Sequence, residues 1–320
     1  MPLVTLDAIR AAADRIGSIA RRTPVINVSD LAGRPLFLKC EPQQPGGAFK
    51  IRGATNMLMR LSADARRRGV ITYSSGNHGQ AVALAASRLG APAVVVMPTT
   101  TPAIKINGVK RWGAEAILEG TTSADRLKRA QAEAASRGLT MVPPFDHEWI
   151  IEGQGTCGLE ILDQVPDVEV VAVPMGGGGL ISGVAAAVKL SGSRAKVVGV
   201  EPEGAAKITA SLAAGHPVTL DRTASIADGL MPVRPGDLTF EHIRAFVDEV
   251  VTVSDDQIAK AALWLFYEAK QVVEPSGAAT VAAVLAGQGK ILADRSKKIV
   301  AILSGGNVAP ETLAALGHGH

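Results

Sequence analysis

The chain of 320 residues is 47% hydrophobic and 20% charged, which is enough apolar material for a large core divided between two lobes. The net charge is only +3, there is no block of five or more basic residues, and 3% of the residues are aromatic, so neither nucleic-acid nor membrane-surface binding is expected. No apolar run approaches the roughly 18 residues that span a bilayer, and no signal-peptide pattern opens the chain. Because Cys40 and Cys157 also suit a reducing compartment, a cytoplasmic protein is predicted.

Short apolar segments alternate along the chain with alanine-rich segments that have helical spacing. Helical periodicity begins within residues 1–20. Strands are then predicted at residues 36–41, 69–75, 91–98, 114–120, 169–175, 195–202 and 297–306. Most of these are near-continuous runs of Val, Ile and Ala, which is typical of strands covered on both faces. The pattern predicts an α/β protein with mostly parallel sheets.

Three predicted strands end in a turn rich in glycine or serine that starts a helix: SSGNHGQ, PMGGGGLISG and LSGGNV. In open α/β sheets, ligands bind outside the carboxyl ends of the strands. The three turns therefore predict one composite site.

The second of these turns contains four consecutive glycines between a strand and a helix. They are Gly176, Gly177, Gly178 and Gly179. Glycines can expose backbone N–H groups at a helix start, which predicts a phosphate site, although a loop packed against another backbone is the alternative. The dinucleotide pattern G-x-G-x-x-G fails because Ile181 and Ser182 stand where it requires glycine, and the P-loop lysine is also missing. A nucleotide is therefore disfavoured as the ligand.

Lys50 lies near the start of a predicted helix in PGGAFKIRGATN. The positive end of the helix macrodipole disfavours an ammonium group there, so a lowered pKa and a free amine are expected. A solvated surface lysine is the alternative, but the apolar neighbours Phe49 and Ile51 speak against it. A phosphate site together with a reactive amine points to a monophosphate cofactor that reacts with amines.

The motifs FKIRGATN, SSGNHGQAVA, GGGGLISG and LSGGN resemble, in order and spacing, those of the fold-type II pyridoxal-phosphate enzymes. More narrowly, they resemble the threonine/serine dehydratase and serine racemase family, and the resemblance covers almost the whole chain. It implies a fold similar to tryptophan synthase β, with two open, twisted, mostly parallel sheets and helices on both faces. Residues 1–64 and 146–320 would form a large domain that binds pyridoxal 5'-phosphate, and residues 65–145 a small domain that closes over the substrate. A homodimer or homotetramer is also implied.

The resemblance assigns roles to the residues of the composite site. Lys50 would form a Schiff base with the cofactor, and Phe49 would lie against its ring. The four glycines and the N–H group of Leu180 would hold the phosphate, and Asn77 would bind the ring hydroxyl. Ser304 would meet the pyridine nitrogen. Glu274 would lie near the cofactor edge, although a buried structural carboxylate is nearly as good an interpretation.

The segment that follows the predicted strand 69–75 would bind the carboxylate of a small amino-acid substrate. Its residues are Ser74, Ser75, Gly76, Asn77 and His78. An ordinary core or surface histidine remains an alternative for His78. In racemase-like members, a serine matching Ser75 is the acid–base group on the face opposite the lysine.

The implied reaction is the elimination of water from a β-hydroxy amino acid, followed by hydrolysis of the released enamine to a 2-oxo acid and ammonia. Lys50 would take the α-proton, so that L-threonine gives 2-oxobutanoate and L-serine gives pyruvate. Because of Ser75, serine racemisation remains open, as does dehydration of hydroxyaspartate or phenylserine. A regulatory protein that binds a phosphate ligand without catalysis is the non-enzyme alternative.

Two positions depart from the family pattern. Ala48 stands where serine is common. In metal-activated members, a glutamate, a backbone carbonyl and an aspartate bind a divalent cation; Glu201 and Ala205 match the first two, but the third is Lys207. A lysine ammonium beside Glu201 could take the cation position itself. No bound metal, and weak or absent activation by divalent cations, is therefore expected.

Overall fold

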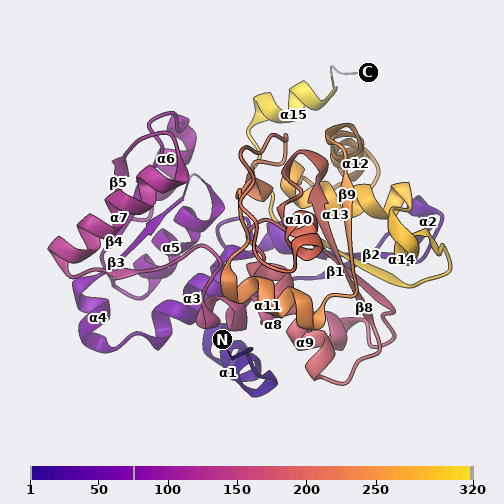
Figure 1. Ribbon diagram of the computed structural model, residues 1–320, viewed down its shortest axis with the longest axis horizontal. Coiled ribbons are helices and arrows are strands. Elements are labelled where there is room, and N and C mark those ends of the chain that lie inside the picture. Colours follow the sequence, from indigo (N-terminus) through magenta and orange to yellow (C-terminus); the bar gives the residue numbers. More distant parts are fainter. Residues whose placement is uncertain (1, 75, 318–320) are drawn as a thin grey trace.

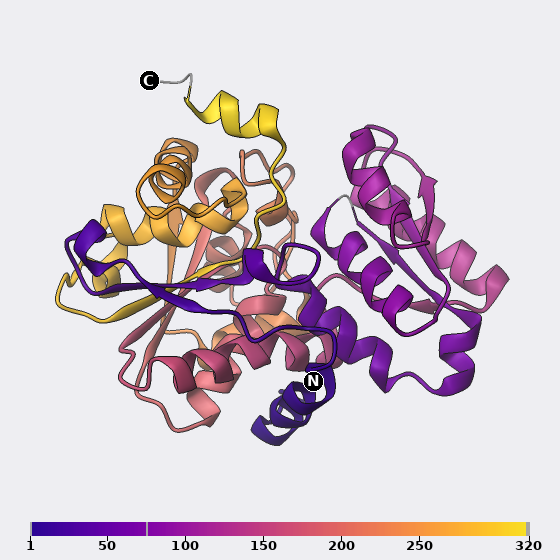
Figure 2. The ribbon, with the colours of Figure 1, turned by 180° about the vertical axis from the view of Figure 1, so that it is seen from behind.

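Two sheets, each with helices packed on its faces, organise the computed structural model, which describes residues 2–74 and 76–317 (Figure 1). The larger sheet has the strand order β1-β2-β10-β7-β8-β9, and the smaller has the order β5-β4-β3-β6. Seen from the front and from behind, the two sheets lie side by side, with α3 (Lys50–Arg60) between them (Figures 1 and 2). The predicted α/β fold is confirmed.

In the larger sheet, only the pairing of β1 with β2 is antiparallel. Its strands are β1 (Val25–Asn27), β2 (Leu36–Cys40), β7 (Val170–Pro174), β8 (Lys196–Pro202), β9 (Glu249–Val253) and β10 (Ile299–Leu303). In the register of the parallel centre, Ile299 of β10 lies opposite Leu36 of β2 and Leu303 lies opposite Cys40. The sequence did not predict β1 or β9, which are the two edge strands.

The smaller sheet is entirely parallel. Its strands are β3 (Val70–Tyr73), β4 (Ala93–Met97), β5 (Glu115–Leu118) and β6 (Thr140–Met141). All four come from one continuous stretch of chain, whereas the larger sheet takes strands from both sides of that stretch. The sequence missed β6, whose two residues are too short to show a period.

Helices connect and cover the strands. The α-helices are α1 (Leu6–Ile16), α2 (Ser29–Ala32), α3, α4 (Ala63–Arg68), α5 (Asn77–Arg88), α6 (Ala103–Lys110), α7 (Ser123–Arg137), α8 (Glu148–Gln164), α9 (Gly179–Leu190), α10 (Lys207–Ala214), α11 (Asp237–Phe246), α12 (Asp255–Tyr267), α13 (Pro275–Ala286), α14 (Gly289–Ala293) and α15 (Pro310–Gly317). Short 3-10 turns are η1 (Glu41–Gln43), η2 (Glu203–Ala205) and η3 (Asp228–Leu230). Local signals set several ends: Thr122 and Asp125 form a capping box at the start of α7, and Gly138 ends it. Within residues 2–74 and 76–317, no helix is long and apolar enough to cross a membrane.

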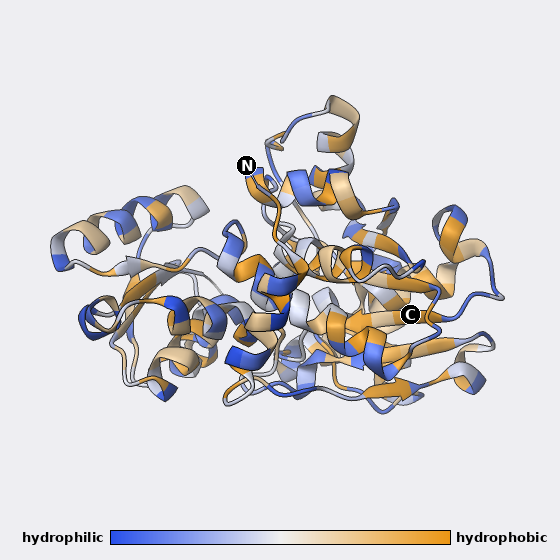
Figure 3. Ribbon diagram, turned by 90° about the horizontal axis from the view of Figure 1, so that it is seen from below, coloured by the Kyte–Doolittle hydropathy of each residue, from blue (hydrophilic) through white to orange (hydrophobic). Residues whose placement is uncertain are grey.

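Both faces of the larger sheet are buried. Successive side chains of a strand point to opposite faces, so Ile299, Ala301 and Leu303 of β10 join one core cluster while Val300 and Ile302 join another. The first cluster contains residues of α12 and α13, and the second contains residues of α8 and α9. This burial explains the near-continuous apolar strands of the sequence, which are orange in Figure 3.

The parallel arrangement brings the expected site together at one edge. β2, β10 and β7 are neighbours, so their carboxyl ends meet at the same edge of the larger sheet. The chain there continues into the segment before α3, into Ser304 and into the four glycines at the start of α9. On the smaller sheet, β3 leads in the same way toward α5.

Candidate active site

Lys50 is the first residue of α3, and the residue before it, Phe49, makes no capping hydrogen bond. The Lys50 ammonium donates a 2.7 Å hydrogen bond to the Pro144 carbonyl, which lies between β6 and α8. Burial lowers the pKa of Lys50 from 10.5 to about 8, a shift that Glu274 opposes only when its carboxyl group is ionised. The direction agrees with the expectation from the sequence, but burial is the main cause rather than the helix start.

The start of α3 is tied to the end of β10. The Phe49 N–H group donates to the Ser304 carbonyl at 3.0 Å, and Ala48 forms an antiparallel bridge with Gly305. Ser304 itself is 4% exposed. The chain thus brings Lys50 and Ser304 to one place although they are far apart in sequence.

Gly176, Gly177 and Gly178 form a tight loop in front of α9, and the fourth glycine, Gly179, is the first residue of the helix. Gly178 adopts φ +97° as the N-cap residue, and a Cβ atom there would lie 2.8 Å from the Thr239 Cβ atom. The Thr239 hydroxyl donates to the Gly177 carbonyl at 2.7 Å. The first hydrogen bond of the helix is the one that the Ser182 N–H group donates to the Gly178 carbonyl. The N–H groups of Gly179, Leu180 and Ile181 come before it in the chain and therefore have no acceptor within the helix. Packing against Thr239 therefore also requires glycine at position 178, as the alternative interpretation held, whereas the N–H groups at the helix N-terminus are the feature that fits a phosphate group.

A chain of hydrogen bonds through Asn77, Glu274 and Asn307 joins the two lobes, by which we mean the larger sheet with its helices and the smaller sheet with its helices. The Asn77 side-chain amide donates to Glu274 Oε1 at 2.7 Å, and the Asn307 amide donates to Asn77 Oδ1 at 2.8 Å. Asn77 begins α5 beside the smaller sheet, whereas Glu274 precedes α13 of the larger lobe. Sequence reasoning gave Asn307 no role, although it ends the LSGGN motif.

Glu274 is 6% exposed, and burial raises its pKa from 4.5 to about 8, with a further contribution from the Asp228 carboxylate. This carboxyl group therefore carries a proton at neutral pH. Asp228 in turn accepts a 2.8 Å hydrogen bond from the Lys105 ammonium of α6 and forms an ion pair with it. Lys105 and Asp228 belong to different lobes, and the sequence indicated neither of them.

The predicted substrate segment is only partly described. The Ser74 N–H group donates to the Val96 carbonyl at 3.0 Å, and the Gly76 N–H group donates to the Ser74 hydroxyl at 3.2 Å. Ser75, the predicted second acid–base residue, lies outside the described residues. His78 Nε2 lies 3.1 Å from the Val142 carbonyl, and burial lowers the pKa of His78 to about 3. These contacts favour the alternative of a neutral core histidine for His78.

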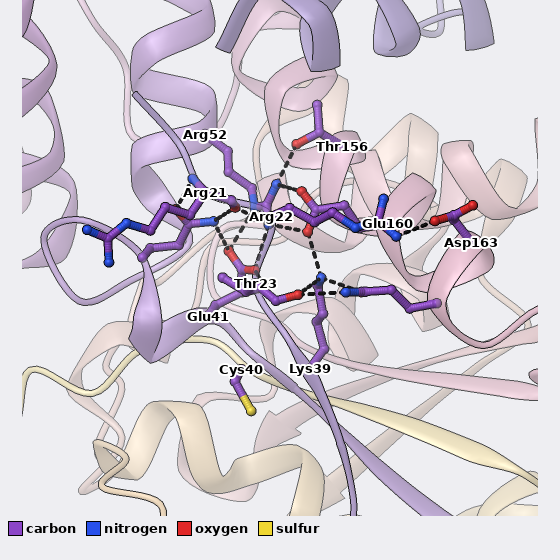
Figure 4. Close-up of polar contacts among 12 residues, drawn as sticks. Arg21, Arg22, Thr23, Lys39, Cys40, Glu41, Arg52, Thr156, Glu160 and Asp163 are labelled. Atoms are coloured by element: carbon purple, nitrogen blue, oxygen red, sulfur yellow. Dashed lines mark hydrogen bonds and ion pairs between the residues drawn. The ribbon is translucent and has the colours of Figure 1, made fainter. Parts of the chain in front are cut away.

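Arg52, two residues after Lys50 on α3, is the centre of a buried network of charged groups (Figure 4). Its guanidinium, 1% exposed, forms paired hydrogen bonds with Glu41, at 2.8 and 2.8 Å, and with Glu160, at 2.6 and 2.8 Å. Lys39 reaches the same Glu160 carboxylate at 2.6 Å. The network joins β2, η1 and α8 to the helix that carries Lys50, and sequence reasoning did not identify it.

Lys207 and Glu201, at the position where the resemblance implies a metal, are both fully buried. The Lys207 ammonium lies 3.3 Å from the Glu201 carboxylate. Within the part of the chain that the structure describes, no group of three or more His, Cys, Asp or Glu side chains could hold a metal ion. The residues present here do not fit a divalent cation.

Comparisons with known proteins agree with this geometry. A family model described as pyridoxal-phosphate dependent enzyme matches residues 16–305. The L-threonine ammonia-lyase of Thermotoga maritima is 42% identical over 309 residues, which cover 96% of this chain and 76% of that protein. A serine racemase of Oryza sativa subsp. indica is 42% identical over 308 residues, covering 95% of this chain and 91% of that one. The solved structure of maize serine racemase has a TM-score of 0.93 at 41% identity, covering 98% of this chain and 97% of that chain.

Proposed function

Because the chain belongs to the family of pyridoxal-phosphate-dependent enzymes and has their fold-type II architecture, we propose that it is an ammonia-lyase acting on L-threonine, L-serine or both. The products are a 2-oxo acid and ammonia. The family, the fold and the cofactor expected from the sequence motifs are confirmed. The choice of substrate and the assignment of individual residues are our proposal.

The described residues fit the cofactor at both of its ends. At the phosphate end, the glycine loop and the Leu180 N–H group are the donors, and Gly178 leaves no room for a side chain. At the ring, we assign Lys50 to the aldehyde carbon, Phe49 to the ring face, Asn77 to the ring hydroxyl and Ser304 to the ring nitrogen. When bound, the cofactor supplies an electron sink for the bonds of the substrate α-carbon.

The observation that carries the proposal is the environment of Lys50. Its pKa of about 8 leaves about one tenth of the side chain as free amine at pH 7, far more than an ordinary lysine has, which suits both cofactor attachment and removal of the α-proton. Glu274, with a pKa of about 8, holds a proton at neutral pH and is a second group that can transfer one. A serine hydroxyl at the ring nitrogen would keep that nitrogen protonated less firmly than a carboxylate would, so the cofactor would be a weaker electron sink. Elimination tolerates this, because the negative charge that develops on the α-carbon need not persist.

A serine racemase is the second candidate. The rice serine racemase and the Thermotoga ammonia-lyase are each 42% identical to this chain, so identity does not separate the two activities. The presence of Ser75 supports racemisation, because a racemase needs an acid–base group on each face of the substrate.

The deciding experiment follows L-serine and, separately, L-threonine with the purified holoenzyme by proton NMR, with chiral analysis of the residual serine. Pyruvate or 2-oxobutanoate forming while the residual serine stays L supports the ammonia-lyase. D-serine forming faster than pyruvate, and lost in Ser75→Ala, would overturn it in favour of the racemase. If neither amino acid reacts, the substrate assignment fails, and hydroxyaspartate and phenylserine become the next substrates to test.

Closure of residues 65–145 over the bound substrate is part of the proposal. It is supported by the continuous smaller sheet and by the Lys105–Asp228 ion pair, which joins α6 to η3 across the two lobes. Assembly as a homodimer or homotetramer and a cytoplasmic location are proposed from the family resemblance. Light scattering of the purified holoenzyme tests the assembly.

A further inference from the structure

Four oxygen atoms from separate parts of the larger lobe converge on the Lys207 ammonium. The carbonyl groups of Met175, Ala205 and Leu230 accept hydrogen bonds from it at 2.9, 3.0 and 3.1 Å. An ammonium has three protons, so the three carbonyls satisfy its donors. The Glu201 carboxylate, 3.3 Å away, balances its charge.

The position of Lys207 requires this compensation. It is the first residue of α10, where the helix macrodipole disfavours a cation, and its side chain has no exposure to water. Glu201 is well held in turn, because it accepts N–H groups of Ile208 at 3.1 Å and Thr209 at 2.8 Å. The carboxylate and the ammonium are therefore a built pair rather than a chance contact.

Two of the three carbonyls that Lys207 binds, those of Met175 and Leu230, lie next to the glycine loop in the chain or against it in space. Met175 directly precedes Gly176, and Leu230 follows Gly229 in η3. These two glycines nearly touch, since a Cβ atom at Gly176 would lie 2.9 Å from the Gly229 carbonyl oxygen. One ammonium thus fixes the end of β7 and the η3 turn relative to each other.

We propose that Lys207 is a tethered cation that positions the phosphate loop, in place of a dissociable metal ion. A divalent ion would have to displace a fully buried ammonium or lie beside it within the same oxygen shell, and both are electrostatically costly. The protein consequently binds its cofactor without an added cation. The inference rests on the role proposed for the glycine loop in binding phosphate.

The first measurement gives the dissociation constants of pyridoxal and of pyridoxal 5'-phosphate. The constant for pyridoxal divided by that for pyridoxal 5'-phosphate is the ratio used below, and it isolates the contribution of the phosphate site. In Lys207→Met, we expect this ratio to fall by about tenfold, the size of effect that outer partners of a binding group produce. The matched control is Lys189→Met, at the end of α9 farthest from the glycine loop. Like Lys207, Lys189 donates a hydrogen bond to a carbonyl, that of Ala195 at 2.9 Å, and pairs with a carboxylate, that of Asp248 at 2.6 Å. The ratio should not change in this control.

The second measurement is chemical rescue. In Lys207→Ala, ammonium chloride should restore the ratio, whereas tetramethylammonium chloride at equal ionic strength should not, because it cannot donate hydrogen bonds. Should Lys207→Ala fail to fold with Glu201 left unpaired, the double variant Glu201→Gln/Lys207→Met removes both charges, and the same fall in the ratio is expected.

Three results would overturn the inference. One is a Lys207→Met protein with the wild-type ratio, since Lys207 would then be only structural. Another is a wild-type protein whose cofactor affinity or thermal stability rises strongly with magnesium or calcium, or falls with EDTA. The third is equal rescue by both salts. A wild-type protein that does not prefer the phosphorylated cofactor would instead refute the glycine-loop assignment.

Discussion

Replacing Arg52 by methionine tests whether the buried network in Figure 4 holds the helix of Lys50 in place. The wild-type network is balanced, with Arg52 and Lys39 against Glu41 and Glu160. The variant leaves two carboxylates with one ammonium, and Glu41 is completely buried. Removing one partner of a buried ion pair costs about 3–5 kcal/mol, so a loss of that size in the free energy of unfolding is expected.

The assay is urea unfolding at pH 7, and the matched control is Arg22→Met, which breaks the exposed Arg22–Asp163 pair at the edge of the same network. An exposed pair contributes about 1 kcal/mol or less. Lysine at position 52 should give an intermediate loss, because it keeps the charge but not the paired hydrogen bonds. An Arg52→Met protein no less stable than Arg22→Met would refute the reasoning.

The loss in Arg52→Met should also depend on pH. Burial alone would raise the pKa of Glu41, but the charge and hydrogen bonds of Arg52 outweigh it and hold the pKa below its ordinary value of 4.5. Without Arg52, Glu41 can escape its unpaired charge by taking up a proton. The stability difference from wild type should therefore shrink as the pH falls from 7 toward 5, and a difference that grows instead would contradict this account.

Three shorter predictions concern the active site. Because the pKa of Glu274 is about 8 in the folded state against 4.5 ordinarily, folding takes up a proton between these pH values, and the free energy of unfolding should fall as the pH rises from 5 to 8. In Glu274→Gln, the free energy of unfolding measured in urea should depend less on pH, and an unchanged dependence would contradict the assignment. Capture of pyridoxal phosphate by the apoprotein, followed by stopped-flow absorbance, should speed up with pH and level off above about 8 as Lys50 loses its proton; a midpoint near 10.5 would show an ordinary lysine. Gly178→Ala should weaken cofactor binding in equilibrium dialysis, because φ is +97° and the new Cβ atom would lie 2.8 Å from the Thr239 Cβ atom. The control Gly192→Ala, at φ +74° with nothing within 4 Å of the new Cβ atom, should lose stability only, and an equal loss of binding in both variants would refute the steric argument.

The sequence by itself determined the features that depend on neighbouring residues. Strands covered on both faces appear as unbroken apolar runs, which is why the central strand β10 was predicted and the edge strands β1 and β9 were not. The four glycines at the start of α9 and the lysine at the start of α3 were also predicted, because a turn and a helix start are local. The order of these motifs was sufficient to indicate the family.

Only the tertiary structure decided which groups meet and how charged they are. Arg52 finds Glu160, 108 residues away, and Asn77 finds Glu274, 197 residues away, and no local spacing indicates such pairs. Burial, which is a property of the whole fold, lowers the pKa of Lys50, raises that of Glu274 and keeps His78 neutral. The partners of Lys207 likewise come from three separate turns. Their convergence follows from the packing of the sheet, because the carbonyl groups involved have no side-chain signature in the sequence.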